Sequence, residues 1–127
     1  MGSEIPSLRG KTLLLVEDDP TLAPFLEMLL SDSGARILTF MAPDAAMLSV
    51  ESVSRLDLLV TDVVLPGKSG FQLAAELSRL HPEIRVLFMS GFGDPEIGAR
   101  DLVVRYDTLL KPFLPEDFLA KIVSLAR

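Results

Sequence analysis

The chain has no cysteine, no tryptophan and a single histidine among its 127 residues. The absence of cysteine excludes disulfides, thiolate chemistry and cysteine-ligated zinc. No apolar run approaches the roughly 20 residues that a membrane-spanning helix needs. The polar start, as far as Lys11, carries no signal-peptide core. We therefore expect a cytoplasmic domain that makes no membrane contact of its own.

Basic residues are also scarce, because 12 Lys and Arg stand against 18 Asp and Glu, for a net charge of −6. This balance disfavours direct binding of nucleic acid, which depends on Lys and Arg facing phosphates. Half of the residues are apolar, which is enough to form a core in a chain of this length. We expect residues 1–10 to be a polar N-terminal tail or a tag remnant, and residues 11–127 to be one domain.

Short apolar runs alternate with helical patterns along the chain. Runs that are apolar on both faces are typical of parallel strands covered by helices. The predicted strands are Thr12–Val16, Arg36–Met41, Leu58–Thr61, Arg85–Met89 and Thr108–Leu110. The predicted helices follow them, over residues 20–33, 43–55, 69–80, 94–103 and 115–126. Asp19 is a good N-cap for the first helix, and Pro20 suits its first position.

Five strand–helix pairs predict a doubly wound α/β sandwich. Right-handed crossovers restrict its topology, and we favour the flavodoxin-like (βα)5 arrangement with a parallel five-stranded sheet in the order 2-1-3-4-5. In such sheets the ligand site lies beyond the carboxyl ends of the strands. The residues found at those ends are Glu17, Asp18, Asp62, Ser90, Gly91 and Lys111.

The three acids of this set predict a metal site. Carboxylates held together repel one another and raise each other's pKa, and a hard divalent cation relieves that repulsion. Mg²⁺ prefers oxygen ligands and keeps several waters. Glu17, Asp18 and Asp62 could provide such oxygens, whereas Asp19 is better explained as a helix cap.

The remaining residues favour phosphoryl chemistry. A carboxylate such as Asp62 is a known covalent nucleophile for phosphoryl groups. The ammonium of Lys111 can pair with Asp62 before transfer and with phosphate after it. The Ser90 hydroxyl and the Gly91 backbone N–H can both donate to a phosphoryl oxygen. Each residue alone also fits an ordinary loop, so the prediction depends on their arrival at one edge.

Four segments, in this order and spacing, resemble the receiver domain of two-component response regulators over nearly the whole chain. The segments are LLLVEDDP (Leu13–Pro20), DLLVTDVVLPGKSG (Asp57–Gly70), VLFMSG (Val86–Gly91) and LLKPF (Leu109–Phe113). The resemblance implies a phospho-accepting signalling domain, not an enzyme in its own right. It further implies that Asp62 accepts a phosphoryl group from a phosphohistidine with the help of Mg²⁺, and that the domain then changes conformation.

By position, the resemblance implies that Asp18 is a direct metal ligand, that Glu17 acts through water and that Val64 offers its backbone carbonyl. It implies that Ser90 is the switch hydroxyl and Lys111 the site lysine. The expected partner is a histidine kinase or a phosphotransfer-domain protein. A homodimer through the fourth helix, fifth strand and fifth helix is a further expectation.

Two positions depart from the family pattern. Thr108 stands three residues before Lys111, where the family usually has an aromatic residue that rotates on activation, and Tyr106 is two residues too early to replace it. Val64 and Phe92 are apolar where many members have polar groups that position water. We hypothesise that these two apolar side chains exclude the attacking water, so that phospho-Asp62 is long-lived.

Several alternatives remain open. The MSGF segment (Met89–Phe92) is similar to receivers of hybrid sensor histidine kinases, so we expect a domain excised from such a kinase, with a single-domain response regulator as the alternative. A Mg²⁺-dependent aspartyl-phosphate phosphatase would want a second Asp where Val64 stands. A flavin or nucleotide module would want a Gly-rich loop after the first strand. A pseudo-receiver would keep the fold without phosphorylation.

Overall fold

The computed structural model describes residues 8–94 and 102–127 of the chain. In these ranges, no helix is long and apolar enough to cross a membrane. The elements, in chain order, are β1 (Thr12–Val16), α1 (Leu22–Leu30), β2 (Arg36–Phe40), α2 (Pro43–Val50), β3 (Leu58–Asp62), α3 (Gly70–Leu80), β4 (Arg85–Ser90), β5 (Tyr106–Leu110) and α4 (Pro115–Ala126).

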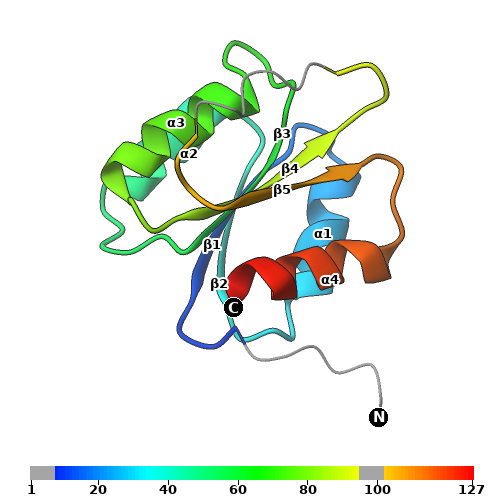
Figure 1. Cartoon of the computed structure of the whole chain (residues 1–127), viewed down its shortest axis with the longest axis horizontal. Helices are drawn as coiled ribbons and strands as arrows, with labels where there is room; N and C mark the ends of the chain where they lie inside the picture. Colours follow the sequence, from blue (N-terminus) through cyan, green and yellow to red (C-terminus); the bar gives the residue numbers. More distant parts are fainter. Residues whose placement is uncertain (1–7, 95–101) are drawn as a thin grey trace.

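The five strands form one parallel sheet in the order β2-β1-β3-β4-β5 (Figure 1). This order confirms the flavodoxin-like arrangement predicted from the sequence. Helices α2 and α3 cover one face of the sheet, and α1 and α4 cover the other (Figure 1). The sheet is therefore the middle layer of three.

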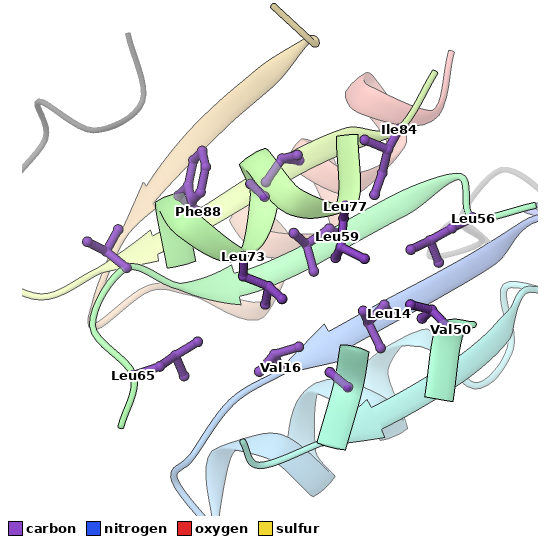
Figure 2. Close-up of a cluster of buried hydrophobic side chains, with 14 residues drawn as sticks. Leu14, Val16, Val50, Leu56, Leu59, Leu65, Leu73, Leu77, Ile84 and Phe88 are labelled. Carbon is purple, nitrogen blue, oxygen red and sulfur yellow. The ribbon is translucent and has the colours of Figure 1, made fainter. Parts of the chain in front are cut away.

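Alternation along the strands divides the core in two. Leu14 and Val16 of β1 belong to the cluster under α2 and α3, and Leu13 and Leu15 belong to the cluster against α1 and α4. Figure 2 shows the first cluster, in which Phe88 from β4 lies with side chains from β1, β3, α2 and α3. Successive side chains of a strand point to opposite faces, so a strand buried on both faces is mostly apolar.

The boundaries predicted from the sequence match the observed helices and strands closely at some elements and less well at others. The strand Thr12–Val16 and the helix over residues 115–126 are confirmed. Helix α2 ends at Val50, short of the expected residue 55. Strand β5 begins at Tyr106, two residues before the predicted start. The expected helix over residues 94–103 falls mostly on residues 95–101, outside the described part of the chain.

Two helix starts follow from side-chain capping. Asp19 Oδ1 accepts hydrogen bonds from the backbone N–H groups of Thr21 and Leu22, at 2.8 and 3.2 Å. Asp19 therefore caps these backbone groups as predicted, but the helix begins at Leu22, with Thr21 at its N-cap position, and not at Pro20. At α3, the Ser69 hydroxyl accepts from the Gln72 N–H, and the Gln72 side chain accepts in return from the Ser69 N–H. This reciprocal capping box satisfies backbone donors that the helix itself leaves unpaired.

Leu8, which precedes β1, is already packed into the fold. Leu8 is 3% exposed, and its N–H donates to the Ser33 carbonyl at 2.7 Å. The division into a tail over residues 1–10 and a domain over residues 11–127 stays a prediction.

Candidate functional site

The strand register brings the predicted site residues to one edge of the sheet. Asp62 of β3 is paired with Met89 of β4. Ser90, the next residue of β4, is paired with Leu110 of β5. The Lys111 N–H continues this ladder by donating to the Ser90 carbonyl at 2.8 Å. Because the strands are parallel, their carboxyl ends lie side by side at this edge.

One lysine holds two buried carboxylates at the centre of the site. Lys111 Nζ lies 2.6 Å from Asp62 Oδ1 and donates a hydrogen bond to Glu17 Oε1 at 2.9 Å. The Glu17 side chain is fully buried, and the Asp62 side chain is 6% exposed. The peptide bond between Lys111 and Pro112 is cis.

Burial and the shared cation shift the pKa of each group. Burial, with the Glu17 carboxylate as a second cause, raises the pKa of Asp62 to about 8, although Lys111 acts in the opposite direction. For Glu17, burial opposes ionisation, but hydrogen bonds with Asp62, Lys111 and the Asp19 N–H outweigh it and lower the pKa. Burial also disfavours the charged form of Lys111, yet the two carboxylates outweigh it and raise the lysine pKa.

The acids form a cluster that fits a divalent cation. One carboxylate oxygen each from Glu17, Asp18 and Asp62 lies within 4.8 Å of the others. In the described part of the chain, the buried Asp62 Oδ1 is paired with the Lys111 ammonium alone, which leaves acceptor capacity for a metal ion. An all-oxygen cluster with one exposed member, Asp18, suits a hard ion that retains water. These three residues therefore fit the expected Mg²⁺ site.

Helix α3 approaches the backbone of Asp62 closely. A Cβ atom placed on Gly70 would lie 2.0 Å from the Asp62 carbonyl oxygen, and the Gly70 N–H donates to the Val63 carbonyl at 2.8 Å. Only a residue without a side chain permits this approach. The sequence contains Gly70 in the second quoted segment, but its role needs the three-dimensional structure.

A second residue that the sequence does not indicate is Asp94. Its Oδ2 accepts a hydrogen bond from the Gly91 N–H at 2.6 Å. The Gly91 N–H, which the sequence predicts to contact a phosphoryl oxygen, is thus already bonded to a carboxylate. Ser90 lies half-buried beside it, at the last position of β4.

The sequence over residues 13–123 matches the response regulator receiver domain. The chain belongs to this family. It is similar to the transcriptional regulatory protein YbdJ of Bacillus subtilis, with 32% identity over 93% of this chain and 52% of the relative. It is also similar to the response regulator receiver protein CpdR of Brucella abortus, with 31% identity over 91% of this chain and 96% of the relative.

The receiver fold is also found among solved structures. A response regulator receiver domain protein from Clostridium thermocellum superposes with a TM-score of 0.80, at 24% identity, over 91% of this chain and 94% of that chain. This receiver chain spans about half the length of YbdJ and nearly all of CpdR.

At position 108, where receivers usually have an aromatic residue, the structure also differs from the family pattern. Thr108 lies exposed on β5. Tyr106, on the same side of the strand two residues earlier, packs edge-on against Phe88 with ring centroids 5.8 Å apart. The Tyr106 ring is thus engaged with a core side chain.

Proposed function

We propose that Asp62 accepts a phosphoryl group from a phosphohistidine, with Mg²⁺ held by Glu17, Asp18 and Asp62, and that this changes the conformation of the receiver. The observation that carries the proposal is the buried Asp62 carboxylate, which is paired with Lys111 and clustered with two more acids. A structural ion pair alone would not need the acids of β1 and β3 to converge on one point.

In the transfer step, an Asp62 carboxylate oxygen forms a bond to phosphorus while the phosphorus–nitrogen bond of the phosphohistidine breaks. The imidazole nitrogen leaves with the electron pair of that bond and takes up a proton. Bound Mg²⁺ would supply neutralisation of the charge on the phosphoryl oxygens. Without metal the pKa of Asp62 is raised to about 8, so its carboxyl must lose a proton before it attacks, and the positive charge of a bound Mg²⁺ would favour that ionised form.

After transfer, the new group carries more charge and more acceptor oxygens than a carboxylate. Lys111 is 28% exposed at the open side of the pair, so its ammonium can turn from Asp62 to a phosphoryl oxygen. The Ser90 hydroxyl, at the end of the neighbouring strand, would donate to another. The Val64 backbone carbonyl, two residues beyond Asp62, is the proposed fourth oxygen ligand of the metal.

The proposed donor is a histidine kinase or a phosphotransfer-domain protein. A mostly apolar cavity of about 510 Å³ opens beside Lys111, and its walls include Leu22, Phe25 and Phe113. A partner helix could bury apolar side chains there while presenting its phosphohistidine to Asp62. The proposed homodimer would use β5 and α4, together with residues that lie outside the described part of the chain.

The parent protein is best proposed as a response regulator. YbdJ and CpdR are named as a transcriptional regulator and a receiver protein, which favours this alternative over the hybrid-kinase origin. The similarity to CpdR over 96% of its length supports a stand-alone receiver, and the 52% coverage of YbdJ supports a longer regulator.

Beryllofluoride, a phosphoryl mimic, tests the proposal against a pseudo-receiver. We expect saturable, Mg²⁺-dependent binding to the wild-type protein, measured by fluorine NMR, and no binding to Asp62→Asn. Failure of the wild type to bind, or equal binding by the variant, would overturn the assignment of Asp62. Circular dichroism of both proteins establishes that the variant is folded.

A further inference from the structure

The segment after β4 forms a closed turn. The Asp94 N–H donates to the Gly91 carbonyl at 3.1 Å, and the Gly91 N–H donates to Asp94 Oδ2 at 2.6 Å. Gly93, between them, has a φ of +88°, which glycine adopts without strain. Two hydrogen bonds therefore join residues 91 and 94 in opposite directions and hold the turn shut.

This turn lies beside the acid cluster. Gly91 directly follows Ser90, whose carbonyl accepts from the Lys111 N–H, and the Lys111 ammonium lies 2.6 Å from Asp62. A bond from an N–H to a carboxylate is charge-assisted and roughly twice as strong as a neutral one. The backbone donor at this edge is therefore engaged by an internal anion.

We propose that Asp94 is a positioning residue that holds the Gly91 N–H in the unphosphorylated receiver and competes with the phosphoryl group for it. The inference rests on the proposed phosphorylation of Asp62. A phosphoryl oxygen and the Asp94 carboxylate are both anionic acceptors, and one N–H cannot serve both well. Their like charges also repel at short range.

Release of Asp94 would open the turn. The conformational change would then be transmitted along residues 91–94 and would not depend on an aromatic side chain at position 108. The bond between Gly91 and Asp94 thus provides a two-state element whose closed form is the one seen here.

The test measures beryllofluoride affinity at saturating Mg²⁺ for the wild type, Asp94→Ala and Asp94→Asn. We expect Asp94→Ala to bind about three- to tenfold more tightly, because the Gly91 N–H is freed and a charge is lost. Asp94→Asn keeps an acceptor but loses the charge, so its affinity should fall between the other two. Asp32→Asn is the control, since it removes an exposed carboxylate beyond the far end of α1 and should bind as the wild type does.

Two further readouts separate positioning from a general structural effect. Mg²⁺ affinity without beryllofluoride should be unchanged in Asp94→Ala, because Asp94 is not in the acid cluster. In the wild type, beryllofluoride should shift the Asp94 side-chain carboxyl resonance in carbon NMR as the Gly91 N–H leaves it. Unchanged or weaker beryllofluoride affinity in Asp94→Ala, or an unmoved carboxyl resonance, would overturn the inference. Loss of binding by the wild type itself would instead overturn the proposed function.

Discussion

Lys111 Nζ lies 2.6 Å from Asp62 Oδ1 and 2.9 Å from Glu17 Oε1, so one ammonium serves two buried carboxylates. One positive charge cannot neutralise two carboxylates, and the oxygen cluster completed by Asp18 fits a divalent cation that would supply the rest. This shortage of positive charge determines how the site should respond to mutation, to pH and to metal.

Lys111→Ala should lower the free energy of unfolding by about 1–3 kcal/mol in the absence of Mg²⁺, because it leaves two buried acids without their cation. Added Mg²⁺ should restore part of the loss. Lys121→Ala is the matched control: it breaks an exposed pair with Asp107 and should cost no more than about 1 kcal/mol, independently of Mg²⁺. Urea titrations measure both, and equal losses in the two variants would contradict the account of the site.

Without Mg²⁺, the free energy of unfolding should fall as pH rises from about 5 to 8. The pKa of Asp62 is raised to about 8 in the folded protein, whereas the unfolded chain loses this proton near pH 4. The folded state thus binds more protons in this window, and its advantage is lost as pH rises through the folded pKa. The slope is on the order of 1 kcal/mol per pH unit.

Asp62→Asn is the control for this pH dependence, because it retains every other titrating group. The lowered pKa of Glu17 and the raised pKa of Lys111 place their titrations outside this window. Urea titrations at pH 5, 6, 7 and 8 should show the decline in the wild type alone. A parallel decline in the variant would assign it to another group.

Gly70→Ala should destabilise the protein by about 1–3 kcal/mol and weaken Mg²⁺ binding. The added methyl group would meet the Asp62 carbonyl oxygen and push the end of β3 out of place. Ser69→Ala, at the preceding position, removes the helix cap at a cost of about 1 kcal/mol without touching Asp62. Calorimetry measures the Mg²⁺ affinity of both variants. If Gly70→Ala binds Mg²⁺ as tightly as the wild type and Ser69→Ala do, the close approach of Gly70 to Asp62 does not position the metal ligands.

The lifetime of phospho-Asp62 should be minutes or longer, because Val64 and Phe92 cannot orient an attacking water. Phe92 is 97% exposed and Val64 57% exposed, so neither shields Asp62 like a lid in this conformation. Val64→Asn should therefore shorten the lifetime by adding a polar group, whereas Phe92→Ala should change it little. Phosphate release measures the decay, and a wild-type half-life of seconds would contradict the hypothesis.

The sequence predicts the fold well because the strands are apolar on both faces and alternate regularly with helices. Leu13–Val16 could hardly be anything but an interior strand. It also predicts the main site, because the carboxyl ends of parallel strands must meet. Strand β5 is less visible, since Tyr106 and Asp107 at its start interrupt the apolar run at the sheet edge.

Other features need coordinates because they join residues that no pattern links. The shared pairing of Lys111 with Glu17 spans 94 residues. The bond from Gly91 to Asp94 is local, but an Asp in a Gly-containing turn is common and does not indicate where its carboxylate points. The need for glycine at position 70 depends on the distance to Asp62 across a loop.

The central claim is that Asp62 accepts a phosphoryl group, and intact-mass spectrometry tests it most directly. The wild-type protein and Asp62→Asn are incubated with Mg²⁺ and phosphoramidate, a small donor with the phosphorus–nitrogen bond of phosphohistidine. We predict that the wild type gains the mass of one phosphoryl group, that removal of Mg²⁺ prevents the gain, and that Asp62→Asn gains none. No gain by the wild type, or an equal gain by the variant, would contradict the account.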